Sequence, residues 1–231
     1  MNNLPPVTKN LLIVNVLCFL GMIVLRKYGI DLTEYVGLHF FMASHFNPVQ
    51  IVTYMFMHAN FEHILFNMFA LWMFGRTLEA VWGQKRFLLY YILCGVGAAL
   101  IQELVQYMEY AFVLSNYQAV AVGSTHIPMG EYLNMMNTIG ASGAIYGILM
   151  GFGMLFPNAE LFIIPIPFPV KAKYFVFGYI VLELFLGIFM TSDGVAHFAH
   201  LGGMIFGFIL IRYWRKKGQI GRYNFCYTES V

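Results

Sequence analysis

Charge is scarce in this 231-residue sequence, because Asp, Glu, Lys and Arg make up only 10% of it. An average soluble domain carries about 25% charged residues. So few charges do not cover the water-facing surface of a folded domain of this size. Hydrophobic residues make up 60% of the chain and occur in long blocks separated by short polar stretches. This pattern predicts a multi-pass integral membrane protein, with the lipid bilayer as a partner.

Net positive charge and cysteine are also scarce. A formal net charge of +2 gives nucleic-acid binding no electrostatic basis. The three cysteines, Cys18, Cys94 and Cys226, are far apart and have no metal-type spacing. An Arg- and Ser-rich transit sequence is absent. The first apolar block lacks an A-x-A-like cleavage site, so we expect a retained first span rather than a cleaved signal peptide.

Six apolar blocks can each cross a bilayer, which requires about 20 residues in a helix. All six are predicted to be helices, because an isolated strand would leave backbone polar groups unsatisfied in lipid. The predicted fold class is all-α, a six-transmembrane-helix bundle forming one domain over residues 1–231, with a core at roughly 10–215. The predicted spans are roughly Leu11–Leu25, Val52–Phe74, Phe87–Tyr107, Thr138–Phe156, Tyr174–Met190 and Val195–Trp214. The helix-breaking prolines within Leu161–Val170 predict a loop after the fourth span.

The distribution of lysine and arginine predicts the orientation of these spans. With the N-terminus inside, only Arg26 and Lys27 lie outside. The other eleven of the thirteen basic residues lie inside: Lys9, Arg76, Lys85, Arg86, Lys171, Lys173, Arg212, Arg215, Lys216, Lys217 and Arg222. Both termini are therefore predicted to be cytoplasmic.

A serine, Ser142, lies in the glycine-rich segment GASGAIYG that opens the fourth span. In the predicted topology it lies about one turn inside the fourth helix from the outer face, below the surface but shallow enough for water to reach. Gly140 and Gly143 allow a neighbouring backbone to approach closely. Taken alone, the segment is better explained as a packing face in which serine is one more small residue. It is not the G-x-S-x-G elbow of soluble hydrolases.

The sixth block contains two histidines, His197 and His200, in VAHFAHLGGMIFG. Histidine in a membrane span is costly and therefore indicates a functional candidate. Gly203 and Gly207 form a small-residue face on roughly the side of His200, which would let this helix approach the fourth. A nucleophilic serine needs an adjacent base, and His200 fits that role for Ser142. A purely interhelical hydrogen bond is the alternative for His200 and the favoured interpretation of His197.

The second block carries further polar residues in HANFEHILFNM. His58 lies near its outer end, whereas His63 and Asn67 lie one turn apart on a single helical face. Both side chains can donate to a developing oxyanion, together with the Ser142 amide near the start of its helix. An interhelical clamp is the alternative role for Asn67.

A metal site receives little support from the sequence. His58, Glu62 and His63 read H-x-x-x-E-H, one residue longer than the inverzincin motif, and there is no H-E-x-x-H. His197 and His200 offer two more ligands, but no nearby aspartate or cysteine completes a set. We predict neither a metal nor a cofactor.

No acidic residue is an obvious third member of a triad. Glu103 and Glu183 fall in the third and fifth spans and Asp193 in the loop before the sixth. None has a spacing that ties it to His200, so a Ser–His dyad is the simpler prediction. Tyr146, one turn below Ser142, can pack against the imidazole.

Together these motifs resemble the rhomboid family of intramembrane serine proteases, over roughly residues 10–215. The matching patterns are H-x-x-x-x-H-x-x-x-N in the second span, G-A-S-G-x-x-Y-G in the fourth and A-H-x-G-G-x-x-x-G in the sixth. GRTLEAVWGQKRF (75–87) also resembles the turn that follows the family's second span. The first external loop lacks the W-R pair of some members, which leaves its packing open.

The resemblance implies roles for residues in three spans. It makes Ser142 the nucleophile, His200 the base, and His63 and Asn67, with the Ser142 amide, the oxyanion stabilisers. His58 matches a histidine near the water-retaining part of the site. The implied supporting residues also include Tyr146, Gly140, Gly143, Gly203 and Gly207.

The resemblance also implies an activity and a location. The family cleaves transmembrane protein substrates near the outer membrane face, without a metal or cofactor. We expect a bacterial inner membrane. An inactive rhomboid-like binding protein is one alternative, although such relatives lose the nucleophile or base that this chain retains. A small transporter is another, but its ionisable residues would follow a pathway rather than gather toward one face.

Overall fold

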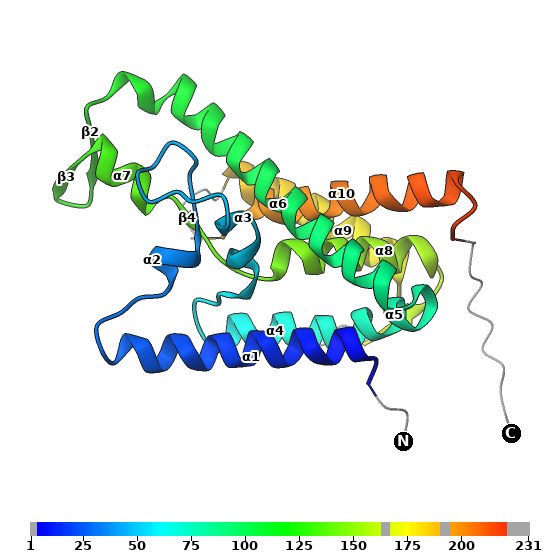
Figure 1. The fold of residues 1–231 in the computed structure, drawn as a ribbon. Coiled ribbons are helices and arrows are strands. Elements are labelled where there is room, and N and C mark those ends of the chain that lie inside the picture. The colour runs from blue at the N-terminus through cyan, green and yellow to red at the C-terminus, as the bar shows by residue number, and fades with distance from the viewer. Residues whose placement is uncertain (1–3, 163–166, 190–194, 221–231) are drawn as a thin grey trace, which may run out of the picture.

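The computed structural model of the chain describes residues 4–162, 167–189 and 195–220. This part of the chain is predominantly helical (Figure 1). The longer helices are α1 (Pro6–Arg26), α4 (Phe61–Ala70), α6 (Gln84–Phe112), α8 (Ser142–Leu155), α9 (Ala172–Phe189) and α10 (His197–Lys216). The shorter ones are α2 (Thr33–Val36), α3 (Gln50–Thr53), η1 (Tyr54–Phe56), η2 (Leu71–Gly75), α5 (Arg76–Trp82), η3 (Leu114–Asn116) and α7 (Met129–Met135).

In the described part of the chain, three short antiparallel ladders accompany the helices, and the all-α prediction did not include them. They are β1 (Leu38–His39) with β4 (Asn137–Thr138), β2 (Ala119–Val122) with β3 (Thr125–Pro128), and β5 (Glu160–Leu161) with β6 (Val170–Lys171). All three lie in connections between helices. The first ladder pairs Leu38 with Thr138 and so ties the first long loop to the segment that enters α8.

Within the described residues, four helical segments are long and apolar enough to cross a membrane: Pro6–Arg26, Phe61–Trp82, Gln84–Asn116 and Ala172–Phe189. Helix α8 is apolar but has only 14 residues. Such a helix is roughly 21 Å long, shorter than the ~30 Å hydrocarbon core. Helix α10 has 20 residues but carries Arg215 and Lys216 in its last turn, and it is not among the four. The described part of the chain thus contains four candidate spans, and six spans remain a prediction.

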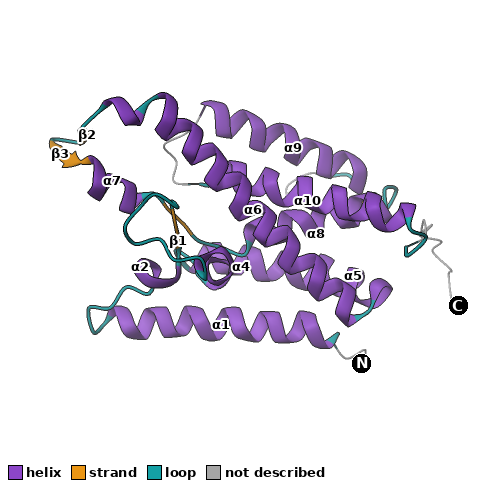
Figure 2. Cartoon of the chain, turned by 45° about the horizontal axis from the view of Figure 1, so that its top comes forward, coloured by secondary structure: helices purple, strands orange, loops and turns teal. Residues whose placement is uncertain are grey.

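The core is formed by α6, α8 and α10, which pack most extensively against one another. Helix α8 lies inside the bundle, with α9 and α10 on one side and α4 on the other (Figure 2). Ile148 of α8, Tyr90 of α6 and Met204 of α10 are completely or almost completely buried. By contrast, α1 and α9 expose large apolar side chains such as Leu17 and Phe185, as lipid-facing helices do.

The two ends of the bundle differ. The start of α1, helix α5 and the end of α10 lie at one end, which we call the basic end (Figure 1). Helices α2 and α7 and the β2–β3 hairpin lie at the opposite end, which we call the hairpin end. Helices α1 and α10 therefore begin and end, respectively, on the same side of the bundle.

The second predicted span, Val52–Phe74, is wrong as a continuous helix. Helix α3 and turn η1 end at Phe56, and Met57 is extended. Helix α4 begins only at Phe61, because the Asn60 side chain caps it by accepting a 2.8 Å hydrogen bond from the His63 amide. The break places His58 in a turn rather than on the helix.

Polar contacts hold the first long loop at the hairpin end, without the W-R pair. The Glu103 carboxylate of α6 accepts a 2.8 Å hydrogen bond from the Phe41 amide. The Gln50 side chain donates to the carbonyl oxygens of Tyr35 and His45, at 3.1 and 3.0 Å. The loop is therefore attached to α6 and α3 as well as to β4.

A buried carboxylate at the basic end joins α1 to α5. Glu79 accepts hydrogen bonds from the amide of Val7 at 2.9 Å and from the amide and hydroxyl of Thr8, both at 2.7 Å. These are the orphan amides of a helix N-terminus, where negative charge is favourable. The contact fixes α1 against the bundle.

Candidate active site

The backbones of α8 and α10 are in direct contact where both helices carry glycine. A Cβ atom added at Gly203 would collide with the carbonyl oxygen of Gly143. One added at Gly207 would lie 3.1 Å from the carbonyl oxygen of Gly147, which already accepts a 2.6 Å hydrogen bond from the Tyr90 hydroxyl. Glycine spacing thus brings the two helices together.

This approach brings the serine of α8 and a histidine of α10 into contact. His200 Nε2 lies 2.8 Å from Ser142 Oγ. Ser142 is the first residue of α8, so the expectation that it lies one turn inside the helix is wrong. Its N–H is one of the four at the helix start that lack an intrahelical acceptor. The position also gives it the positive end of the helix dipole.

Tyr146 lies one turn further along α8 and stacks on the His200 ring. The ring centroids are 4.2 Å apart and the planes differ by 6°. Such parallel contact restricts rotation of the imidazole. The orientation of the His200 ring is therefore fixed by α8, the helix that also carries Ser142.

Glu183 of α9 joins this cluster, and sequence reasoning missed its place in it. Its side chain is buried, and Oε1 accepts a hydrogen bond from the Tyr146 hydroxyl. Oε2 lies 2.6 Å from His197 Nδ1 and 3.0 Å from His200 Nδ1. The contact with His200 is at ion-pair distance but bent, because this N–H does not meet the angle of a hydrogen bond. The available signal was an isolated carboxylate within an apolar run.

The structure distinguishes the two histidines of α10. His200 contacts Ser142 and Tyr146, whereas His197 is buried and bonded to Glu183. Asp193, the other acidic residue near α10, lies outside the described residues.

Gly140 brings the second predicted motif close to Ser142. Its φ of +131° is a conformation that side-chain-bearing residues rarely adopt. A Cβ there would lie 2.8 Å from His63 Nε2 and 3.5 Å from Ser142 Oγ. The His63 ring and the Ser142 hydroxyl therefore face the same stretch of backbone.

The other two predicted polar residues contact His63. Asn67 is buried, and its amide donates a 2.8 Å hydrogen bond to the His63 carbonyl oxygen in its own helix. The His58 ring contacts the His63 ring edge-on at 5.1 Å. His58 is completely buried, and neither of its ring nitrogens has a well-aligned hydrogen-bond partner among the described residues. Buried polar atoms of this kind are usually satisfied by water.

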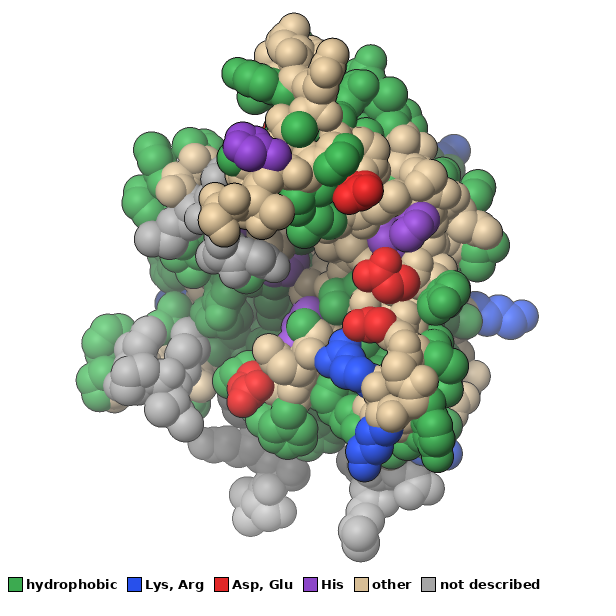
Figure 3. Space-filling view, turned by 90° about the vertical axis from the view of Figure 1, so that its left-hand side faces the viewer, with side chains coloured by type: hydrophobic (Ala, Val, Ile, Leu, Met, Phe, Trp, Pro, Cys, Tyr) green, Lys and Arg blue, Asp and Glu red, His purple; other side chains and the backbone are tan. Residues whose placement is uncertain are grey.

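The surface of the hairpin end contains a hollow. Figure 3 views this end and shows histidine side chains recessed in the hollow, with hydrophobic side chains around them.

Two groups of side chains within the described residues are close enough to hold a metal ion. In the first, Glu34, His39 and His45, the His39 ring nitrogens already face the carbonyl oxygens of Asn134 and Glu34 at 2.8 and 3.1 Å. The second is Glu183, His197 and His200. The N–H groups of the two imidazoles facing the Glu183 carboxylate account for the short distances in this group. A metal ion would have to replace those protons.

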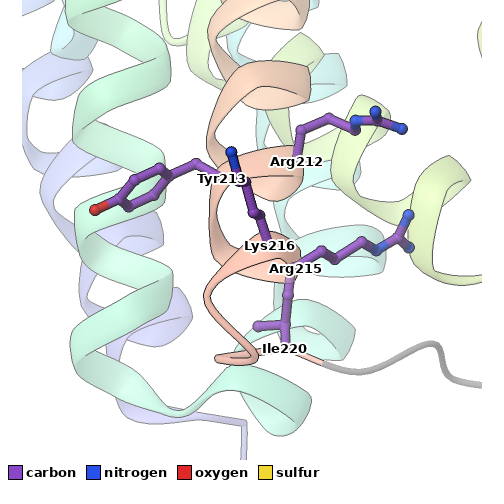
Figure 4. Close-up of a pocket in the computed structure, with 5 residues that line it drawn as sticks. All are labelled: Arg212, Tyr213, Arg215, Lys216 and Ile220. Atoms are coloured by element: carbon purple, nitrogen blue, oxygen red, sulfur yellow. The ribbon is translucent and has the colours of Figure 1, made fainter.

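A cavity of about 640 Å³ lies elsewhere, at the basic end (Figure 4). It is lined by Arg212, Tyr213, Arg215, Lys216 and Ile220. Fifteen positions of α10 separate His200 from Arg215, roughly 22 Å along the helix axis. The cavity is therefore not part of the serine site.

Comparison with known proteins matches the rhomboid domain family over residues 45–217. The chain is 31% identical over 178 residues to "Rhomboid protease AarA" of Providencia stuartii, covering 75% of this chain and 59% of that protein. It is 28% identical to "Rhomboid protein 1, mitochondrial" of Saccharomyces cerevisiae over 185 residues, 79% of this chain and 44% of that one. "Rhomboid-like protein 11, chloroplastic" of Arabidopsis thaliana is 26% identical over 215 residues, 80% and 65% of the two chains.

The chain therefore belongs to the rhomboid family, as its motifs predicted, and it is an integral membrane protein. It spans between about two fifths and two thirds of the length of these three relatives. They are proteins of bacteria, mitochondria and chloroplasts.

Proposed function

We propose that this protein is an intramembrane serine endopeptidase that uses Ser142 and His200 to hydrolyse peptide bonds in or near transmembrane segments of membrane proteins. The observation that carries the proposal is the 2.8 Å contact between Ser142 Oγ and His200 Nε2 in a partly buried site. Relatives named as rhomboid proteases support the same activity. We propose a single domain whose reaction needs no metal or cofactor.

The reaction follows from this geometry. Ser142 Oγ attacks the carbonyl carbon of the scissile bond and gives its proton to His200 Nε2. Collapse of the tetrahedral intermediate breaks the C–N bond, and His200 returns the proton to the leaving amine. Water then attacks the Ser142 ester, gives a proton to His200, and releases the acid as that proton returns to Ser142 Oγ.

The negative charge on the tetrahedral intermediate needs donors. We assign the Ser142 N–H, the His63 ring and the Asn67 amide to this role. The Ser142 N–H is available at the start of α8, and the His63 ring lies across Gly140 from the Ser142 hydroxyl. For Asn67 the proposal requires its amide to turn away from the His63 carbonyl when substrate binds.

The proposed membrane arrangement extends the four candidate spans to six by adding α8 and α10. Both termini are then cytoplasmic, the basic end faces the cytoplasm, and the hairpin end faces outward, in the inner membrane of a bacterium. The 14-residue length of α8 fits this arrangement, because the chain enters it in an extended form through β4. Ser142 then lies below the outer surface, under the hollowed face.

Cleavage of a single-span substrate by the purified protein in detergent tests the proposal. The wild-type protein should cleave it, and Ser142→Ala and His200→Ala should not, although both should insert in membranes. Normal cleavage by Ser142→Ala would contradict the mechanism. Loss of wild-type activity on chelation would support a metal enzyme at Glu183, His197 and His200 instead.

A further inference from the structure

A carboxylate buried within an apolar helix needs donors, and among the described residues those of Glu183 come from the proposed catalytic cluster. Its exposed fraction is 3%. The Tyr146 hydroxyl donates to Oε1, and the Nδ1 atoms of His197 and His200 lie 2.6 and 3.0 Å from Oε2. Buried charges are stable only when they are paired and hydrogen-bonded. Glu183 meets this condition through residues of α8 and α10.

The position of this carboxylate determines which tautomer of His200 is favoured. A carboxylate accepts hydrogen bonds but does not donate them. His200 Nδ1 faces Oε2 of Glu183, so the proton of a neutral ring is favoured on Nδ1. Nε2 is then unprotonated and can accept the proton of Ser142 Oγ, 2.8 Å away. A general base requires this tautomer.

The same contact stabilises the positive charge that forms on His200 during the reaction. When His200 takes the proton of Ser142 it becomes an imidazolium, whose Nδ1 is 3.0 Å from a carboxylate oxygen. In a site shielded from water, such an attraction is much stronger than at an exposed surface. This argument does not require a linear hydrogen bond, which the bent contact lacks.

Tyr146 and His197 hold the Glu183 carboxylate in position next to the His200 ring. Tyr146 stacks on His200 and donates its hydroxyl to Glu183, so one side chain sets the positions of both. His197 Nδ1 donates a hydrogen bond to Glu183 Oε2 at 2.6 Å, which is shorter than the 3.0 Å contact of His200 Nδ1 with the same oxygen. This gives His197 a role other than that of the base, which is to orient Glu183.

We propose that Glu183 is a positioning residue that holds His200 in the base-competent tautomer and stabilises its protonated form, so that the site works as Ser142–His200–Glu183. The inference rests on the proposed peptidase activity. The alternative is that Glu183 only joins α9 to α8 and α10. That alternative predicts a loss of stability without a loss of turnover by the folded protein.

Glu183→Gln in the full chain, purified in detergent, separates the two. The amide keeps the shape of the carboxylate but removes its charge, and it can donate to Nδ1 and so favour the wrong tautomer. We expect kcat to fall on the order of 10²- to 10⁴-fold, with KM for the transmembrane substrate changed by less than about twofold. Glu183→Asp, which restores the charge on a shorter side chain, should recover at least about tenfold of the loss.

Controls keep the result decisive. Glu79→Gln also removes a buried carboxylate, and its kcat should equal that of the wild type. If Glu183→Gln does not accumulate as folded protein, Tyr146→Phe keeps the stacked ring and removes one donor to Glu183, and kcat should fall about tenfold. If folded Glu183→Gln has a kcat within twofold of wild type while Ser142→Ala is inactive, the proposed role of Glu183 is overturned and the proposed peptidase activity is not. Undiminished cleavage by Ser142→Ala would overturn the proposed function itself.

Discussion

Glu79 and Glu183 lie in different parts of the bundle and are the two least exposed of the buried glutamates among the described residues, with exposed fractions of 2% and 3%. Glu79 binds the amides of Val7 and Thr8 and the Thr8 hydroxyl, which stay neutral at every physiological pH. Glu183 contacts two imidazoles and a phenol beside a serine. Burial of a carboxylate therefore does not by itself indicate function. The chemistry of the donors distinguishes Glu79, which joins α1 to α5, from Glu183, which contacts the proposed catalytic residues.

The largest expected effect is at the base. His200→Ala removes the hydrogen-bond partner that the Ser142 hydroxyl has among the described residues. Cleavage should fall on the order of 10⁴-fold, the upper range for loss of a general base. The measurement is the single-turnover cleavage rate in detergent. Residual turnover above a tenth of wild type would assign the base to another residue.

Asn67→Ala tests the oxyanion site next to the dyad. The rate should fall on the order of 10²- to 10³-fold, as for the loss of one oxyanion donor. The steady-state kcat for the transmembrane substrate measures this. If Asn67 only binds the His63 carbonyl, the variant should lose thermal stability and keep its kcat.

Gly203→Ala tests whether the contact between α8 and α10 sets the distance from base to nucleophile. The new Cβ meets the Gly143 carbonyl oxygen, so the helices must separate. A displacement of about 1 Å should cost on the order of 10²-fold in rate. Gly178→Ala in α9 is the matched control, since its Cβ would meet nothing within 4 Å and should leave the rate unchanged. Equal rates in the two variants would contradict this role of the glycines.

His197→Ala should have a smaller effect, because this ring contacts Glu183 and not Ser142. We expect activity to be retained and reduced about tenfold, the effect of losing one neighbouring hydrogen bond. The readout is kcat beside that of His200→Ala. Complete inactivity of a folded His197→Ala protein would reverse the assignment of the two histidines.

Glu79→Gln should have the smallest effect on the reaction and a clear effect on the fold. It leaves the buried donors at the start of α1 partly unsatisfied, which costs about 1–3 kcal/mol of stability. Thermal unfolding in detergent should shift down while kcat per folded molecule stays at the wild-type value. A fall in kcat equal to that of Glu183→Gln would remove the distinction between the two glutamates.

Much of the bundle was predictable because apolar blocks of membrane length are strong signals. The break at His58 was less visible, since a single Asn60 cap interrupts an otherwise apolar segment. The three ladders were not predictable, because pairs of two to four residues leave no periodic pattern.

Parts of the candidate site were also predictable from the sequence, and other parts were not. Glycine spacing in two spans predicted that Ser142 and His200 approach each other, because small residues determine which faces can touch. Nothing in the sequence predicted that Glu183 faces them. The rotation of α9 is set by packing against α8 and α10, and an apolar helix with one carboxylate has no amphipathic pattern to reveal it.

The central claim is that Ser142 is an activated nucleophile, and labelling with a fluorophosphonate tests it most directly. In the reaction the serine oxygen bonds to phosphorus and fluoride leaves, so only a serine with a working base is modified. We predict that mass spectrometry finds the label on Ser142 of the wild-type protein, with none on Ser142→Ala and little on His200→Ala. An unlabelled wild-type protein, or equal labelling of the Ser142→Ala variant, would contradict the account.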